Sequence, residues 1–266
     1  MADEAGFNLP TDAFVEVLLR LPTSARRRFR LVCKRWRDAI DELTPERQVR
    51  TKILAFICSP GSRAVVFDET DGRLRHEWTY DPSIRGGVVY MVGTCNGLIC
   101  LHETGDGYRS KITVANPITG ETLALPPVPE AWDTFPHHGL HGFGYHPTTG
   151  RYKVVRVPSF IAWRKDTVHV LTLGDGDQAA AAWREVTAPP AAAGQGHNSF
   201  CGMVCVDGTT YWFTTRADRV MALDLEHERV ACFAGPPGVR AVGRTAEASW
   251  KVTNVHARLG VAVPRY

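Results

Sequence analysis

Residues 9–41 read LPTDAFVEVLLRLPTSARRRFRLVCKRWRDAID, and their apolar side chains follow a helical spacing that the rest of the chain lacks. The first half places apolar residues at intervals of three and four, as on one face of an α-helix: Phe14, Val17, Leu18 and Leu21. We expect Thr11 or Asp12 to cap this helix and Pro22 to end it. The N-terminal part is therefore predicted to be helical.

A second apolar set follows in the same segment, again at threes and fours: Phe29, Val32, Cys33, Trp36, Ile40 and Leu43. On a helical wheel the basic residues fall away from this stripe: Arg27, Arg30, Lys34 and Arg37. Phe29, Cys33 and Trp36 are expected to be buried. Helices this short cannot bury both of their faces among themselves, so the sequence predicts that they need a partner.

Seven Lys or Arg residues lie between Ala25 and Ile40, which raises the alternative of a nucleic-acid contact. The whole chain carries a net charge of only +3, whereas a dedicated nucleic-acid binder usually has a more basic domain. Acidic residues also follow at once, at Asp38, Asp41 and Glu42. These basic side chains are predicted to lie on a solvated helical face. The alternative is that they contact an acidic patch on a protein partner, and we expect no binding of nucleic acid.

From about residue 53 the pattern changes to short apolar runs separated by turn signals. Asn96-Gly97 and Asp207-Gly208 are dipeptides typical of tight β-hairpins, and Thr119-Gly120 and Thr149-Gly150 lie in further candidate turns. This spacing predicts an antiparallel β domain built as a sandwich, barrel or propeller. A faint repeat favours the propeller, because residues 114–127 (VANPITGETLALPP) and 222–237 (ALDLEHERVACFAGPP) share one scheme. Unrelated hairpins with similar turn chemistry are the alternative.

The overall composition, 44% apolar and 22% charged, is that of an ordinary soluble globular protein. No apolar stretch approaches the ~20 residues of a membrane span, and the start, MADEAGFNLP, does not resemble a secretory signal. The seven cysteines are an odd number, which favours reduced structural thiols. We therefore expect a cytoplasmic or nuclear protein that does not associate with membranes.

The segment 9–41 resembles an F-box, through Leu9-Pro10, Leu21-Pro22, Arg28-Phe29, Val32-Cys33-Lys34 and Trp36. The remainder resembles the F-box-associated domain of plant F-box proteins in GTCNGLICL (93–101), NPITGETLALPP (116–127), FGYHPTTGRYKVVRV (143–157), VHVLTLGDG (168–176), WREV (183–186), DGTTYWF (207–213) and LDLEHERV (223–230). The resemblance implies an α+β multidomain chain. Residues 1–8 are expected to be disordered, residues 9–45 to form a three-helix F-box, and residues 50–266 to form an all-β, propeller-like domain.

The same resemblance implies a substrate-recognition subunit of a Skp–cullin–F-box ubiquitin ligase, with no catalytic residue and no cofactor of its own. The F-box would dock on the Skp-type adaptor, and through it on a cullin, while the β domain would bind an unidentified target protein. Helix-in-groove docking uses apolar anchors at this spacing. The expected adaptor-binding residues are Leu9, Pro10, Val17, Leu18, Leu21, Pro22, Phe29, Val32, Cys33 and Trp36. Trp36 especially has the alternative role of packing among the helices.

The chain departs from the family pattern in two places. Arg26 and Arg27 stand where the family usually has apolar residues, so they either lay their aliphatic stems along the adaptor or weaken its binding. At about 45 residues per blade, the part after residue 51 amounts to only four or five blades. We therefore expect a propeller-like domain that is either complete or cut short at its C-terminus.

Two other groups of residues are candidates for binding. The loop FPHHGLHGFGYHP (135–147) could hold a metal through His138 and His141, which would suit an enzyme on a propeller-like scaffold, but no accompanying metal motif supports this and an ordinary surface loop is favoured. Aromatic residues in loop-like stretches of the β half are candidate target contacts, with filling of the β core as the alternative. They are Trp78, Trp132, Phe135, Trp163 and Phe200.

Overall fold

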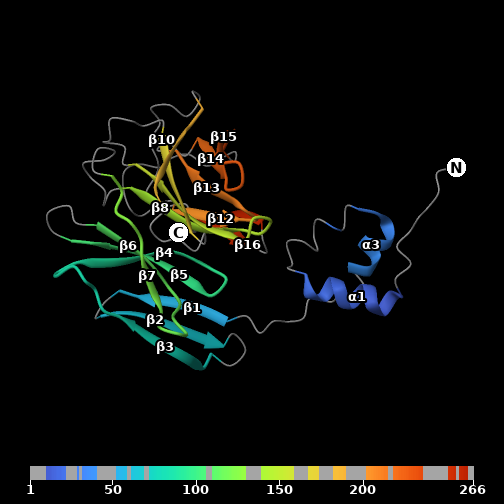
Figure 1. Cartoon of the computed structure of the whole chain (residues 1–266), viewed down its shortest axis with the longest axis horizontal. Coiled ribbons are helices and arrows are strands. Elements are labelled where there is room, and N and C mark those ends of the chain that lie inside the picture. The colour runs from blue at the N-terminus through green and yellow to red at the C-terminus, as the bar shows by residue number, and fades with distance from the viewer. Residues whose placement is uncertain are drawn as a thin grey trace. The chain divides into compact units, whose positions relative to one another are not determined.

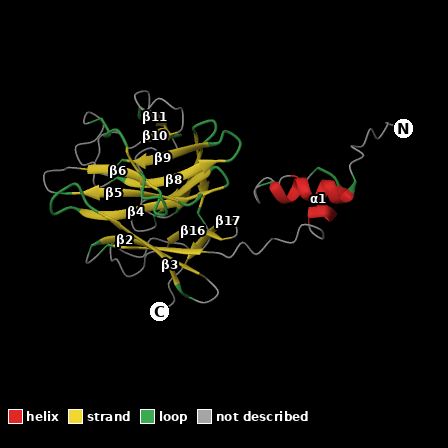
Figure 2. Ribbon diagram, turned by 60° about the horizontal axis from the view of Figure 1, so that its bottom comes forward, coloured by secondary structure: helices red, strands yellow, loops and turns green. Residues whose placement is uncertain are grey.

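The computed structural model describes residues 10–21, 29, 32–40, 52–58, 61–68, 72–105, 110–129, 139–158, 167–173, 182–189, 202–214, 218–235, 251–255 and 258–262. The chain divides into two compact units, Met1–Lys52 with Asp68–Gly72, and Ile53–Phe67 with Arg73–Tyr266. Helices lie in the N-terminal part and strands fill the second unit (Figures 1 and 2). The predicted order, a short helical region followed by an all-β region, is confirmed. In the described part of the chain no helix is long and apolar enough to span a membrane.

The helical unit contains α1 (Thr11–Arg20) and α3 (Lys34–Asp38) in its described part. The cap of α1 differs from the prediction, because Pro10 is the capping residue and no side chain bonds the free N–H groups. Proline suits this place, since its fixed φ fits a helix start and the missing N–H would lack an intrahelical partner anyway. The helix ends as predicted: Leu21 is extended, the conformation that a following proline favours.

In the described part of the chain the strands form five sheets in chain order, and the strand pairs with a described register are antiparallel. The first sheet contains β1 (Lys52–Ile57), β2 (Ser62–Asp68) and β3 (Leu74–Tyr80). The second contains β4 (Val88–Cys95), β5 (Leu98–Thr104), β6 (Ser110–Ala115) and β7 (Thr122–Ala124). The third contains β8 (Leu140–His146), β9 (Arg151–Val157), β10 (Thr167–Leu173) and β11 (Arg184–Thr187). The fourth contains β12 (Met203–Val206), β13 (Thr209–Phe213), β14 (Arg219–Asp224) and β15 (Arg229–Ala234), and the fifth β16 (Lys251–Val255) and β17 (Arg258–Ala262).

The first strands of successive sheets meet at the centre of the β unit. Strand β8 contacts β4 on one side and β12 on the other, and β12 also contacts β16, so these four strands gather together in Figure 1. Within the second, third and fourth sheets each following strand lies one place further from that centre. This is the arrangement of propeller blades, and it matches the predicted propeller-like class.

Hydrophobic cores lie between neighbouring sheets, so the inner sheets are covered on both faces. Adjacent residues of one strand therefore point into different cores: Val154 packs against the second sheet and Val155 against the fourth. Strands β5, β8 and β10 are buried along almost their whole length for this reason. Double coverage explains why the sequence shows short continuous apolar runs in place of strict alternation.

Candidate functional site

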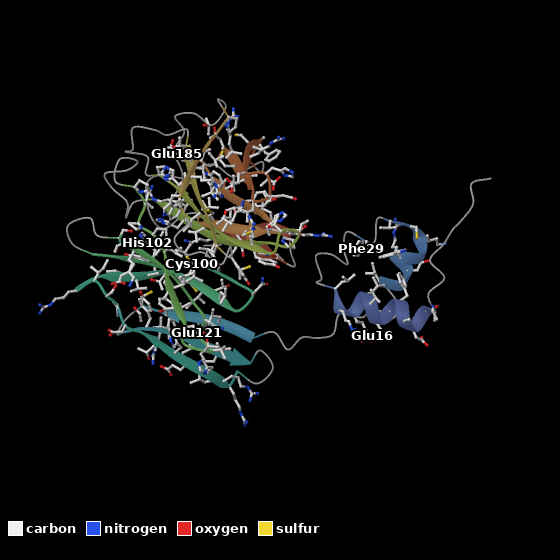
Figure 3. The ribbon with its side chains drawn as sticks, viewed as in Figure 1. Glu16, Phe29, Cys100, His102, Glu121 and Glu185 are labelled. Atoms are coloured by element: carbon white, nitrogen blue, oxygen red, sulfur yellow. The ribbon has the colours of Figure 1, made fainter. Side chains whose placement is uncertain are left out.

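The helical unit has a small aromatic core. The Trp36 ring lies 4.9 Å from the Phe14 ring, edge to face, and 5.1 Å from the Phe29 ring. Phe14 and Leu18 of α1 are buried against Ala39 and Ile40. The structure therefore places Trp36 in its alternative role, packing among the helices. Figure 3 labels its neighbour Phe29.

The residues expected at the adaptor divide into two groups. Leu18 is buried, and Leu21, Phe29 and Trp36 are half-buried in the helical core. By contrast, Val17 is 50% exposed, Val32 is 60% exposed, and Pro10 and Cys33 are also exposed. The expectation that Cys33 is buried was wrong, because it precedes α3 and faces away from the core. Leu9 and Pro22 lie outside the described residues.

Exposed valines on a helical unit this small are available to a partner. On α1, Val17 flanks the buried stripe of Phe14 and Leu18, whereas Glu16 points to the opposite side of the helix. Glu16 forms a solvent-exposed pair with Arg20 at 3.2 Å. Of the basic run, Lys34 and Arg37 are exposed, as expected of a solvated face, and Arg26, Arg27 and Arg30 lie outside the described residues.

The β unit has two unlike ends. At one end of its second, third and fourth sheets the strands are joined by two- to four-residue turns: 96–97, 147–150, 207–208 and 225–228. At the other end the strand ends are joined by longer segments: 105–109, 125–139, 158–166, 188–202 and 214–218. Strand pairing places these ends together, since Leu140 is opposite Val157 and Thr167 is opposite Thr187. We call them the tight-turn end and the long-connection end; two longer segments, 116–121 and 174–183, also join strands at the tight-turn end.

The predicted tight turns are confirmed by their backbone. Asn96 and Gly97 have φ values of 51° and 81°, and Asp207 and Gly208 have 46° and 76°. Two consecutive residues with positive φ form the hairpin turn whose twist matches the strands on either side. These two dipeptides are thus structural, and they set the registers of β4 with β5 and of β12 with β13.

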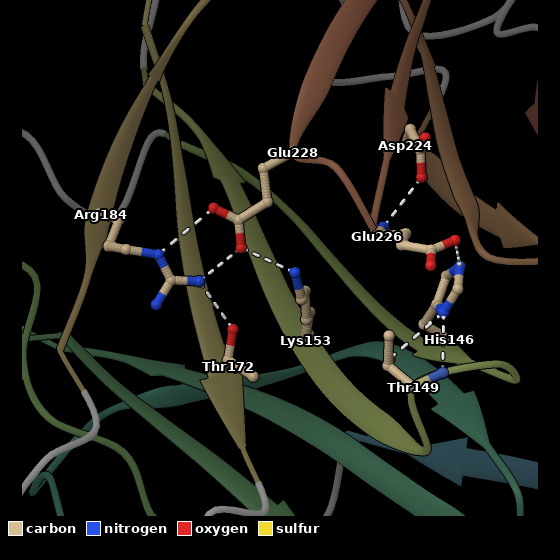
Figure 4. A network of polar contacts seen from close by, with 8 residues as sticks. All are labelled: His146, Thr149, Lys153, Thr172, Arg184, Asp224, Glu226 and Glu228. Atoms are coloured by element: carbon tan, nitrogen blue, oxygen red, sulfur yellow. Dashed lines mark hydrogen bonds and ion pairs between the residues drawn. The ribbon is translucent and has the colours of Figure 1, made fainter.

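Charged residues at the tight-turn end join the fourth sheet to the third. Glu228, in the turn between β14 and β15, accepts a hydrogen bond from Lys153 Nζ at 2.7 Å, and Arg184 donates to both of its carboxylate oxygens (Figure 4). Arg184 also donates to Thr172 at 2.8 Å. Partial burial alone would raise the pKa of Glu228, but the hydrogen bonds from Arg184 and Lys153 outweigh it and lower that pKa. We call Lys153, Arg184 and Glu228 the Glu228 cluster.

A second contact holds the same turn. His146 Nδ1 accepts a hydrogen bond from the Thr149 backbone N–H at 3.2 Å, and its Nε2 lies 3.5 Å from the Glu226 carboxylate. Asp224 accepts from the Glu226 backbone N–H at 2.8 Å, closing the turn from within. The turn between β14 and β15 is therefore fixed to the third sheet at two points, as Figure 4 shows.

The repeated motif of the sequence has the same place in both of its copies. Residues 114–127 and 222–237 each cover the third and fourth strands of a four-stranded sheet. The turn of the first copy also contacts the preceding sheet, since His76 Nε2 on β3 donates to the Pro117 carbonyl oxygen at 2.7 Å. Equivalent places, and a contact of each turn with the preceding sheet, favour a repeated blade unit over the alternative of unrelated hairpins, and they make the motif structural.

The expected target contacts fall at the long-connection end, with one exception. Trp132, Phe135, Trp163 and Phe200 belong to the segments that join strands there, and all four lie outside the described residues. Trp78 lies in strand β3, where it is half-buried, its ring 5.8 Å from that of Tyr80, and packs on the core between the first and second sheets. Trp78 thus follows the alternative of filling the β core.

The histidine loop suggested as a metal site is only partly described. His138 lies outside the described residues, and His141 is a buried residue of β8. Among the residues described, no three His, Cys, Asp or Glu side chains are placed to hold a metal. Burial raises the pKa of Cys95 to about 11 and raises that of Cys100 as well, which leaves both thiols protonated and unreactive near neutral pH.

Sequence reasoning missed a mostly buried polar row at the long-connection end. It contains His141, Arg156, His169 and Glu185 of the third sheet, and the His102 ring of the second sheet lies 4.2 Å from the His141 ring. The available signal was Arg156 itself, a charged residue within the apolar run VVRV of a central strand.

Comparisons with known proteins agree with this two-part architecture. The model of the F-box associated beta propeller domain matches residues 54–265, and that of the F-box domain matches residues 7–47. F-box/LRR-repeat protein At2g43260 of Arabidopsis thaliana is 30% identical over 268 residues, covering 94% of this chain and 59% of that protein. F-box protein At2g43440 of the same plant is 28% identical over 258 residues, covering 93% and 58%. The chain thus spans a little under three fifths of the length of these two relatives.

Proposed function

Because the chain belongs to the F-box proteins that carry an F-box-associated beta-propeller domain, we propose that it is the substrate-recognition subunit of a Skp–cullin–F-box ubiquitin ligase. The helical unit binds the Skp-type adaptor, which links it to the cullin. The β unit binds a target protein, and ubiquitin transfer is catalysed by other subunits. Residence in the cytoplasm or nucleus is part of this proposal, and the location of a fluorescent fusion tests it.

The observation that supports adaptor docking most strongly is the exposure of apolar residues on the helical unit. Leu18 and Trp36 stabilise that unit from within, which leaves Pro10, Val17 and Val32 for a partner. Burying a fully exposed valine side chain contributes about 1.5–3 kcal/mol, and the half-exposed Val17 and Val32 would each contribute somewhat over half of that. Two such residues therefore account for more than a tenfold effect on affinity.

Target binding is proposed at the long-connection end of the β unit. The tight-turn end is held by the Glu228 cluster and by Glu226 with His146, so its polar side chains already contact their own neighbours. Variable recognition surfaces are usually carried by loops on a rigid scaffold. The aromatic residues Trp132, Phe135, Trp163 and Phe200 are the proposed contacts there.

Ubiquitin transfer in a reconstituted assembly tests the proposal. The full chain is mixed with Skp-type adaptor, cullin, RING subunit and the activating and conjugating enzymes, and ubiquitin attached to the chain itself is measured, since no target is needed for this readout. The wild type is expected to be modified and the double variant Val17→Asp/Val32→Asp to lose modification. Glu16→Ala, opposite the buried stripe of α1 and about 100° around the helix from Val17, is the matched control and is expected to keep it. Two outcomes would contradict the proposal: ubiquitin attachment to the wild type in the absence of adaptor, or attachment to the double variant at the wild-type level.

A further inference from the structure

The exposed large apolar side chains of the second sheet gather on one stretch of β4. Val88 is 47% exposed, Tyr90 52% and Met91 39%, and in the described strands of this sheet no other large apolar residue is exposed. Strand pairing places Val88 opposite Thr104, so this stretch lies at the long-connection end. Neighbouring exposed apolar residues of this kind are typical of an interaction surface.

Two of these side chains share one face of the sheet. Val89 packs in the core between the first and second sheets, so Val88 and Tyr90 on either side of it project from the opposite face. Tyr90 is opposite His102, which Figure 3 labels. In the part of the chain that the structure describes, the Tyr90 hydroxyl forms no hydrogen bond. An apolar ring with an available hydroxyl is suited to a protein interface.

The connection that leads into β4 contains a defined turn. The Gly87 N–H donates to the Ile84 carbonyl oxygen at 2.9 Å, and Gly86 has a φ of 71°, which glycine readily adopts at the third position of such a turn. The Ile84 side chain lies over Gly105, where an added Cβ would collide with it. Arg85 is the second residue of this turn and is exposed.

A buried carboxylate holds the turn in place. Glu103 is 1% exposed and accepts hydrogen bonds from the Tyr80 hydroxyl at 3.2 Å, from the Ser83 hydroxyl at 3.1 Å and from the Ile84 N–H. Lys111 Nζ donates to Ser83 Oγ at 3.0 Å. The segment before β4 is therefore ordered before any partner binds, which reduces the entropy cost of binding.

The cations of this surface lack acidic partners. Within the described residues neither Arg85 nor Lys111 forms an ion pair, and the buried Glu103 is occupied by hydroxyl and N–H donors. Asp81 is the only acid in the connection 81–87, so the surface has two cations for one exposed carboxylate. Arginine and tyrosine are enriched among the residues that dominate protein interfaces, and a guanidinium binds a carboxylate through two parallel hydrogen bonds. The complementary partner has an acidic group next to an apolar side chain.

We propose that Arg85, Val88 and Tyr90 bind an acidic segment of the target protein. A carboxylate of that segment pairs with Arg85, and a neighbouring aromatic or aliphatic side chain covers Val88 and Tyr90. This inference rests on the proposed binding of a target by the β unit and gives that target a chemical class. It does not depend on adaptor docking by the helical unit.

Selection of a phage-displayed library of random peptides on the immobilised full chain tests this proposal. The selected sequences are expected to be enriched in Asp or Glu next to an aromatic or aliphatic residue. A synthetic peptide of the consensus sequence is then titrated by fluorescence anisotropy, and its binding is expected to weaken at least about tenfold in Arg85→Glu and in Tyr90→Ala. Arg229→Glu and Ile118→Ala change exposed residues of the tight-turn end and are expected to bind like the wild type.

A charge exchange separates direct contact from structural damage. The consensus peptide with its acids replaced by Lys is expected to bind Arg85→Glu better than it binds the wild type. Because Arg85 and Tyr90 are exposed, both variants are expected to keep the wild-type midpoint in urea. Failure to select any peptide, selected peptides without acidic residues, or consensus binding that Arg85→Glu leaves unchanged would overturn the proposal. Calorimetric binding of the Skp-type adaptor by the same protein would then show that the failure concerns this surface alone.

Discussion

At the scale of single residues, Glu228 shows how a strained turn is kept. Its φ of 53° lies in the left-handed region, which costs a residue with a side chain about 1–2 kcal/mol. The carboxylate offsets this cost by binding Lys153 and Arg184 of the neighbouring sheet. Lys153 is almost completely buried, so it depends on Glu228 for a charged partner. The turn and the sheet contact therefore stabilise each other.

Glu228→Gln is expected to lower the free energy of unfolding by about 1–3 kcal/mol, because it removes charged hydrogen bonds and leaves Lys153 poorly paired. Glu77→Gln is the matched control: its pair with Arg63, at 3.1 Å, is exposed on both sides and is expected to contribute less than about 1 kcal/mol. Urea unfolding at neutral pH measures both. Equal losses in the two variants would show that the cluster adds nothing beyond a surface ion pair.

The lowered pKa of Glu228 also predicts a pH dependence. A carboxylate whose pKa is lowered by folding stabilises the folded state above its ordinary value of 4.5, and this contribution is lost as the pH falls through the lowered value. The difference in stability between wild type and Glu228→Gln is therefore expected to be full near neutrality and to close below 4.5. Unfolding curves taken across that range measure this difference in stability. A difference that grows on acidification would refute the prediction.

At the scale of elements, local signals were readable from the sequence and long-range contacts were not. The hairpins at Asn96-Gly97 and Asp207-Gly208, and the end of α1 before Pro22, depend on one or two neighbouring residues, and they were predicted correctly. The cap of α1 was not, because proline and a side-chain cap are alternative solutions at a helix start. The places of Trp78 and Cys33 depend on which face meets another element, which local spacing does not determine.

Two glycines test what the hairpin turns require. Gly97→Ala is expected to lower stability by about 1–2 kcal/mol through backbone strain alone, because φ is 81° and its added Cβ would meet nothing within 4 Å. Gly208→Ala has a similar φ of 76°, but its Cβ would come within 2.7 Å of the His146 ring, so it is expected to cost more. Thermal unfolding ranks the two, and a Gly97→Ala loss as large as that of Gly208→Ala would refute the role of the His146 contact.

At the scale of the whole molecule, the two apolar patterns of the sequence, helical spacing and short β runs, correspond to two kinds of structure. The change from helical spacing to short β runs predicted a helical region followed by a propeller-like region, and both are present. The candidate site was less predictable. Adaptor residues could be proposed from the motif, but which of them face outward depends on how Phe14, Phe29 and Trp36 pack together. The polar row of His141, Arg156 and His169 needs three strands in register before its members become neighbours.

The division of labour between the two units is the central claim, and calorimetric titration of the full chain with a purified Skp-type adaptor tests it most directly. We predict saturable binding of one adaptor per chain, weakened at least tenfold, or about 1.4 kcal/mol, in Val17→Asp/Val32→Asp and unchanged in Glu16→Ala. Circular dichroism shows whether each variant is folded. Absence of binding by the folded wild type would contradict the account and would make this chain a binding protein that no longer engages the adaptor.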